Sequence, residues 1–160
     1  MSKTHEYRAE LIWTGAAEGP VKDYTGYARA YTVEIPGKPP LEGSADPMFR
    51  GDPALYNPED MLVAALSACH MLTYLALCAR AGIEVRAYGD SASGTMVLEG
   101  GGGRFTEVTL RPRVEVAPGS DLARARALHE AAHGNCFIAN SVNFPVRNEP
   151  DVREAAGPNE

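Results

Sequence analysis

The sequence predicts one compact α+β domain. Its elements are expected in the order β-β-α-β-β-α-β, and strands precede and follow the helices without the regular alternation of an α/β fold. The chain has 160 residues, which is enough for one domain with a modest core. We expect this single domain over residues 1–147 and a loose C-terminal tail over 148–160, where Pro, Gly, Ala and acids show no periodicity.

The first two elements are predicted to be strands over residues 7–14 and 25–35. Both segments alternate and are rich in Tyr, Val, Ile and Thr, and turn-forming residues separate them. A polar, Pro-rich connection follows over 36–56. It is long enough to be a functional loop rather than a simple link.

A long central helix is predicted from Pro58 onwards. Asn57 is a preferred N-cap, Pro58 suits the first helical position, and Glu59 and Asp60 complement the helix dipole. The following residues are apolar nearly all the way round, up to a C-terminal stop at Gly82. A helix that is apolar on all faces must be buried on all faces. In so short a chain this favours a homodimer, in which a second subunit covers one side.

The remaining elements are two strands, a helix and a last strand. The strands are expected over 85–98 and 105–116, joined by a turn at the four glycines 100–103. Ser120 and Asp121 open a second helix that runs to about His133, and residues 142–146 are a candidate short strand.

Composition narrows the partners and the compartment. The net charge is −6 and the acids are spread along the chain, which argues against nucleic acid or an anionic membrane as partner. The polar N-terminus lacks the apolar core of a secretion signal, and no apolar run approaches the length of a membrane span. We expect a cytoplasmic protein, in which the three cysteines are mostly reduced and have a catalytic, metal-binding or packing role.

Helical geometry separates two of the cysteines. Cys69 and Cys78 are nine residues apart on the long helix, so their thiols point to opposite sides and cannot pair within one subunit. Any partner of Cys69 is therefore expected to be Cys136, which follows the second helix. The alternative is that all three are small buried hydrophobic residues, and this interpretation suits Cys78 best.

The segment from Asn57 to Cys69 resembles the signature helix of the OsmC/Ohr family. In these peroxidases an Asn-Pro-Glu start leads, ten residues after the Glu, to the reactive cysteine of an Ala-Cys pair, as Glu59 and Cys69 are spaced here. A second cysteine follows at the second helix, as Cys136 does. The resemblance extends along nearly the whole chain and implies an OsmC-like fold and an intertwined homodimer that shares its N-terminal strands.

The resemblance also implies an activity. Cys69 would reduce an organic hydroperoxide and become a sulfenic acid, and Cys136 would resolve it to a disulfide. An external dithiol of the lipoyl type would restore the thiols, with no cofactor or metal. Such an enzyme would serve as an antioxidant in a stress response.

The family also uses an arginine held by the first glutamate of the helix. Because only a thiolate attacks a peroxide well, a permanently charged guanidinium suits this role. We assign it to Arg50, in the loop before the helix and held by Glu59, as in the OsmC branch. Arg29 is the rival, because the Ohr branch takes its arginine from an earlier strand.

The chain departs from the family pattern at several histidines. His70 stands where an aromatic residue usually follows the reactive cysteine, and His129 and His133 lie on the second helix. One alternative function is therefore a metal site made by Cys69, His70, His133 and Cys136, although their spacing fits no common zinc motif. Another is a non-catalytic dimer that binds a small apolar ligand.

Overall fold

The structure is a computed structural model that describes residues 3–157. The α+β class is confirmed, but residues 3–157 form eleven α-helices and strands where seven were expected: three strands, a helix, four strands, a second helix and two strands. The chain divides into two compact units, Met1–Leu62 and Val63–Glu160, where one domain over 1–147 was expected. Each unit is described by itself below.

The first unit contains a three-stranded antiparallel sheet. Its strands lie in the order β1 (Glu10–Ile12), β2 (Tyr31–Glu34) and β3 (Leu41–Gly43). Two short 3-10 helices complete the unit, η1 (Thr14–Glu18) and η2 (Pro47–Phe49). The first strand is shorter than expected because η1 begins at Thr14. Strand β3 lies in the predicted loop, and its Leu41 pairs with Val33 across the sheet although two prolines precede it.

The long helix α1 (Pro58–Ala81) has the bounds that its sequence predicts. The side chain of Asn57 accepts a hydrogen bond from the backbone N–H of Asp60 at 2.7 Å, so the predicted N-cap is confirmed. At the other end Gly82 has φ +72°, and Ile83 N–H donates to the carbonyl of Cys78. This is the Schellman pattern, which requires a left-handed residue and explains the glycine.

The two sides of α1 differ in burial. Leu66, His70, Tyr74 and Cys78 follow one another at four-residue spacing and are all buried. The side that carries Leu72 is exposed, and Leu72 itself keeps 63% of its surface. The expected burial on all faces is therefore not met by the elements of the second unit. The sequence was expected to hold no apolar run close to the length of a membrane span. By length and hydropathy alone, however, α1 is long and apolar enough to cross a membrane, a test that the core helix of a soluble protein passes as well.

The second unit has two three-stranded sheets, in the orders β4-β7-β9 and β5-β6-β8, in which β8 is Val146–Asn148 and β9 is Asp151–Glu154. Four strands replace the two predicted between the helices, namely β4 (Val85–Asp90), β5 (Ser93–Glu99), β6 (Gly102–Leu110) and β7 (Pro112–Val116). The breaks fall at residues 91–92 and at Arg111, where the carboxylate of Asp90 accepts the backbone N–H of Arg111 at 2.7 Å. Pro112, which has no N–H to donate, begins the next strand. The predicted glycine turn is confirmed, with positive φ at Gly100 and Gly101.

The C-terminal part is more ordered than predicted. Helix α2 (Leu122–Asn135) starts at its expected cap, Asp121, and ends two residues after His133. The last predicted strand, over 142–146, instead lies at β8 (Val146–Asn148) and follows the 3-10 helix η3 (Ala139–Ser141). The tail predicted to be loose contains β9 (Asp151–Glu154), which pairs with β7 and buries Val152 completely. Residues 158–160 of that tail lie outside the described range.

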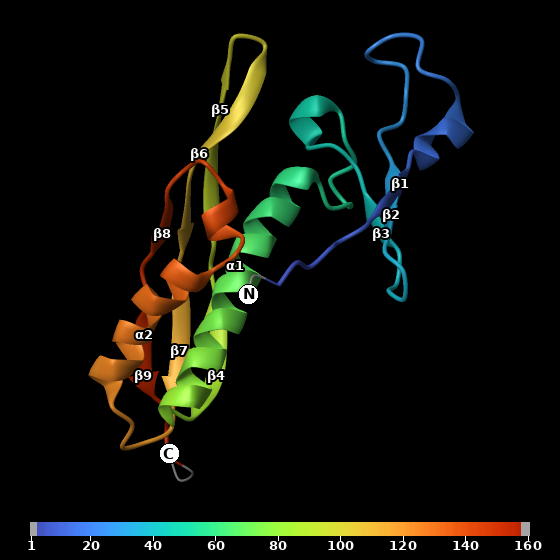
Figure 1. Cartoon of the computed structure of the whole chain (residues 1–160). Coiled ribbons are helices and arrows are strands. Elements are labelled where there is room, and N and C mark those ends of the chain that lie inside the picture. The colour runs from blue at the N-terminus through green and yellow to red at the C-terminus, as the bar shows by residue number, and fades with distance from the viewer. Residues whose placement is uncertain (1–2, 158–160) are drawn as a thin grey trace. The chain divides into compact units, whose positions relative to one another are not determined.

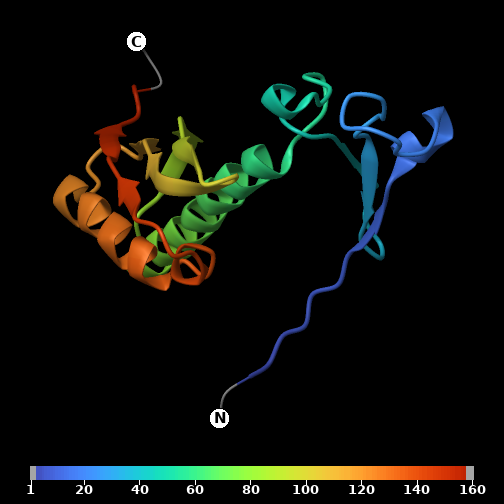
Figure 2. The ribbon, with the colours of Figure 1, turned by 90° about the horizontal axis from the view of Figure 1, so that it is seen from above.

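The core of the second unit lies between the helices and the strands. Figures 1 and 2 show α1 and α2 side by side over the strands. One apolar cluster joins Tyr74 and Cys78 of α1 to Val114 and Val116 of β7. A second cluster joins Leu66 to Val108 and Leu110 of β6. The two clusters fix the middle of α1, which carries Cys69, on the sheet.

Candidate functional site

The structure brings two of the three thiols together. Cys69 lies in the middle of α1 and is partly exposed, whereas Cys136 is the C-cap of α2 and is buried. The two side chains lie close to each other, because Cys69 is among the groups that raise the pKa of Cys136. Cys78 is buried on another side of α1 beside Tyr74, as the nine-residue spacing predicts. Cys69 and Cys136 are therefore the pair that is placed for chemistry.

Cys136 is held mainly as a thiol by its surroundings. The pKa of Cys136 is raised to about 11. Burial is the largest cause, and the nearby Cys69 is the next. The backbone N–H groups of Ala139 and Ile138 act in the other direction, and that of Ala139 donates to Sγ of Cys136 at 3.5 Å. A partly exposed thiol beside a buried one suits a two-step reaction, in which the exposed thiol reacts with a substrate and the buried thiol then forms a disulfide with it.

A buried pair of histidines lies next to the thiols. Nε2 of His70 and Nδ1 of His129 are 3.0 Å apart, and each residue keeps only 1% of its surface. The ring of His129 also stacks on that of Tyr74, with 3.8 Å between centroids. Burial is the largest cause that lowers the pKa of both histidines. The pKa of His129 falls to about 3, because the charge of His70 lowers it further. Both imidazoles are therefore neutral at neutral pH.

A cavity in the first unit contains one of the two candidate arginines. It has a volume of about 280 Å³ and is lined by Arg29, Glu59 and, among others, the aromatic residues Trp13, Tyr27 and Tyr31. The guanidinium of Arg29 lies 3.9 Å over the ring of Tyr27 and donates to the backbone carbonyls of Tyr27 and Tyr24. Burial, and then the charge of Glu59, raise the pKa of Tyr31. An arginine and a glutamate thus share one small aromatic cavity.

The other candidate arginine has a different place. Arg50 is exposed, ends η2 in the left-handed region with φ +66°, and does not line the cavity. It lies near Asp23, whose pKa is lowered first by hydrogen bonds from Thr25 and to a smaller extent by the charge of Arg50. The structure therefore places Glu59 in one cavity with Arg29, the rival, rather than with Arg50.

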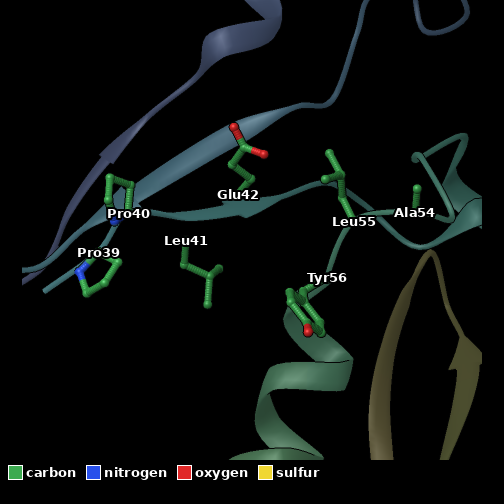
Figure 3. A pocket seen from close by; sticks show the side chains of 7 residues that line it. All are labelled: Pro39, Pro40, Leu41, Glu42, Ala54, Leu55 and Tyr56. Carbon is green, nitrogen blue, oxygen red and sulfur yellow. The ribbon is translucent and has the colours of Figure 1, made fainter.

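A second hollow of the first unit offers little chemistry. Figure 3 shows its lining, which comes from the first two residues of β3, the two prolines before it and residues 54–56. The side chains of Leu41 and Glu42 extend to opposite sides of the strand, and Glu42 is the one carboxylate of the lining. The lining has no thiol, imidazole or basic group.

The metal alternative finds no support in the geometry of residues 3–157. Within that range no group of three or more His, Cys, Asp or Glu side chains is arranged to hold a metal ion. His70 instead faces His129, and Nδ1 of His133 is buried without a hydrogen-bond partner among these residues.

Some of these residues had no clear signal in the sequence. Asn148, which contacts both histidines, falls in the stretch that was predicted to be loose. A signal did exist in the spacing of His129, His133 and Cys136. Intervals of four and three residues are those that place side chains on one face of a helix. No signal in the sequence indicated the aromatic cavity lined by Trp13, Tyr27 and Tyr31, since aromatic residues are also usual in ordinary strands.

Comparisons with known proteins agree with this architecture. The family model described as OsmC-like protein matches residues 51–150. The solved structure of an OsmC-like protein of unknown function from Vibrio cholerae is 35% identical, with a TM-score of 0.83 over 92% of this chain and 100% of that one. An organic hydroperoxide resistance protein from Elizabethkingia anophelis is 21% identical, with a TM-score of 0.68 over 97% of this chain and 100% of that one, and shows the fold alone. The uncharacterized protein YmaD of Bacillus subtilis is 27% identical over 61% of this chain and 68% of its own length.

Proposed function

Because the chain belongs to the OsmC-like family, we propose that it is a thiol-dependent peroxidase that reduces organic hydroperoxides. The observation that carries this proposal is the proximity of partly exposed Cys69 to buried Cys136. The two thiols come from different helices and are 67 residues apart in sequence, so their meeting is a property of the fold. The organic hydroperoxide resistance proteins among the structural neighbours point to the same class of substrate.

The reaction proceeds in three balanced steps. The Cys69 thiolate attacks the terminal oxygen of the hydroperoxide, the O–O bond breaks, and the alcohol leaves with a proton, so that Cys69 becomes a sulfenic acid. Cys136 then attacks Sγ of Cys69, the S–S bond forms, the S–O bond breaks, and the hydroxide leaves as water with the proton of Cys136. An external dithiol, for which a lipoyl group is our candidate, reduces the disulfide and is itself oxidised.

We assign the activating cation to Arg29 and its anchor to Glu59. These two side chains share the aromatic cavity, whereas Arg50 does not line it. An arginine offers several donors in a fixed plane, which suits both a thiolate and the oxygen that leaves with negative charge. The walls of this cavity, made by Trp13, Tyr27 and Tyr31, are apolar and suit an organic group.

We further propose that the protein works as a homodimer in the cytoplasm. The apolar side of α1 that carries Leu72 is left uncovered within the second unit. An exposed apolar stripe on a long helix is costly in water, and a second copy of the same stripe is the simplest cover. The reducing environment of the cytoplasm suits a pair of thiols that must be returned to the dithiol state.

The test is the consumption of a hydroperoxide by the reduced protein. With excess dihydrolipoamide as reductant, the wild type is expected to turn over cumene hydroperoxide repeatedly and faster than hydrogen peroxide. Cys69→Ser is expected to abolish consumption, because its hydroxyl is not a nucleophile at neutral pH. Cys78→Ala serves as the matched control and is expected to retain the wild-type rate. Consumption by Cys69→Ser at the wild-type rate, or none by the wild type, would refute the proposal.

A further inference from the structure

A direct hydrogen bond joins α1 to α2 beside the two thiols. His70 follows Cys69 on α1, and its Nε2 lies 3.0 Å from Nδ1 of His129 on α2. His129 lies on α2 and precedes Cys136, the C-cap of that helix, by seven residues, which is about two helical turns. The hydrogen bond therefore connects the two segments that carry the thiols.

The third partner of this bond fixes which ring donates. The Asn148 side-chain nitrogen lies 3.5 Å from the backbone carbonyl oxygen of His129 and 3.2 Å from Nε2 of His70. A carbonyl oxygen only accepts, so the amide nitrogen faces it and also donates to Nε2 of His70. Nε2 of His70 is therefore an acceptor, and Nδ1 of His129 donates the second hydrogen bond to it.

The surroundings make this arrangement rigid. Both rings are buried, and that of His129 is stacked on Tyr74, which itself keeps none of its surface. Asn148 adds strand β8 to the connection between the helices. A buried donor or acceptor that loses its partner is left unsatisfied, so sliding one helix along the other is opposed.

We propose that the His70–His129 hydrogen bond, oriented by Asn148, is a positioning device that holds Cys136 against Cys69 for disulfide formation. The biological use of this device rests on the peroxidase function proposed above. Disulfides tolerate little variation, because the two Cα atoms must usually lie within about 4.4–6.8 Å of each other. The histidines are positioning residues: they act through the helices and donate nothing to the sulfur atoms.

Near-isosteric pairs of variants separate the hydrogen bond from the packing. In His129→Asn the amide N–H takes the place of Nδ1–H and can still donate to His70, whereas His129→Leu fills a similar volume and cannot. On the other helix, His70→Gln keeps an acceptor near the place of Nε2 and His70→Met removes it. The pair at His70 can still test the hydrogen bond if a variant at His129 does not fold. The midpoint of urea unfolding shows whether each variant is folded.

The primary readout needs no peroxide. The reduced protein is equilibrated in glutathione buffers, where one oxidised glutathione converts the two thiols to a disulfide and is released as two reduced glutathione molecules. A misplacement of about 1 Å can cost as much as a hundredfold in such a proximity effect. We therefore expect the equilibrium constant for the Cys69–Cys136 disulfide to fall roughly ten- to hundredfold in His129→Leu and His70→Met. His129→Asn and His70→Gln are expected to restore it to within about threefold of the wild type.

A second readout follows the reaction itself. Formation of the Cys69 sulfenic acid, trapped with dimedone, is expected to keep the wild-type rate in all four variants. Closure of the disulfide is expected to slow in the Leu and Met variants, which then over-oxidise to the sulfinic acid at lower doses of cumene hydroperoxide.

The two proposals fail separately. No sulfenic acid in the wild type would refute the peroxidase function and leave the glutathione equilibrium as the test of the device. A wild-type equilibrium constant in folded His129→Leu or His70→Met would overturn the device. So would a loss that His129→Asn and His70→Gln, folded as well as the wild type, do not restore.

Discussion

Two arginines compete for one role, and their surroundings distinguish them. Arg29 lines an aromatic cavity with Glu59, whereas Arg50 is exposed and lies near Asp23. We expect Arg29→Met to slow peroxide reduction about ten- to hundredfold, the usual cost of losing one charge-assisted hydrogen bond. The pH at which Cys69 is alkylated at half its maximal rate is expected to rise in the same variant. Arg50→Met is the matched control and is expected to behave as the wild type.

The outcome of that experiment also decides the branch of the family. If Arg50→Met is slow and Arg29→Met is not, the arrangement inferred from the sequence holds and the cavity has another use. If neither variant differs from the wild type, no arginine activates the thiol.

The buried histidines make the stability of the protein depend on pH. Their pKa values are lowered, to about 3 for His129, so the unfolded chain takes up protons near pH 6.5 and the folded one does not. This stability is complete above pH 6.5 and is lost as the pH falls from there toward 3. The charge of His133 also lowers the pKa of His70. The charges of Asp90 and Glu130 raise this pKa, but their effect is smaller than that of burial.

Urea titrations at pH 7 and pH 5 measure this effect. His129 alone is expected to lower the free energy of unfolding by about 2 kcal/mol between the two pH values. A His70→Gln/His129→Asn double variant is expected to lose most of this dependence, and His5→Ala, at an exposed position, to keep it. An equal loss in the wild type and the double variant would contradict a neutral buried pair.

At the scale of the elements, the sequence predicted what depends on local signals. Asn57, Asp121 and Gly82 mark helix ends through hydrogen bonds made within a few residues, and all three were placed correctly. The divided strands were not foreseen, because the carboxylate of Asp90 reaches a backbone N–H 21 residues away. Strand β9 was missed because its partner β7 lies far from it in sequence.

The candidate site follows the same division. The pairing of Cys69 with Cys136 was predictable, because the spacing of Cys69 and Cys78 sets their thiols on different sides of one helix. The placing of Arg29 with Glu59 and of His70 with His129 was not, because each contact joins residues far apart in sequence.

The end of α1 offers a test of one such local signal. Gly82 has φ +72°, so Gly82→Ala is expected to lower the free energy of unfolding by about 1–2 kcal/mol. Gly134→Ala on α2 is the control, because a Cβ there meets nothing within 4 Å and the residue is helical. It is expected to raise the free energy by about 0.5–1 kcal/mol, as alanine usually does in a helix. Equal and small effects at both sites would contradict the left-handed end of α1.

At the scale of the whole molecule, the uncovered side of α1 predicts a dimer. Light scattering at micromolar concentration is expected to give about twice the chain mass of 17.1 kDa. Leu72→Lys places a charge on the exposed apolar side and is expected to weaken the dimer, whereas Leu72→Met keeps the side apolar and is expected to leave it intact. A stable monomeric wild type, or a dimer that Leu72→Lys leaves unchanged, would refute this interface.

The central claim is that Cys69 and Cys136 act as one redox unit and Cys78 stands apart. Its most direct test is to add one equivalent of cumene hydroperoxide to the fully reduced protein and count the remaining thiols before peptide mapping. We expect the three thiols to fall to one, with Cys78 the thiol that remains and a single disulfide joining Cys69 to Cys136. Three thiols after complete mixing, or a dominant disulfide through Cys78, would contradict the account.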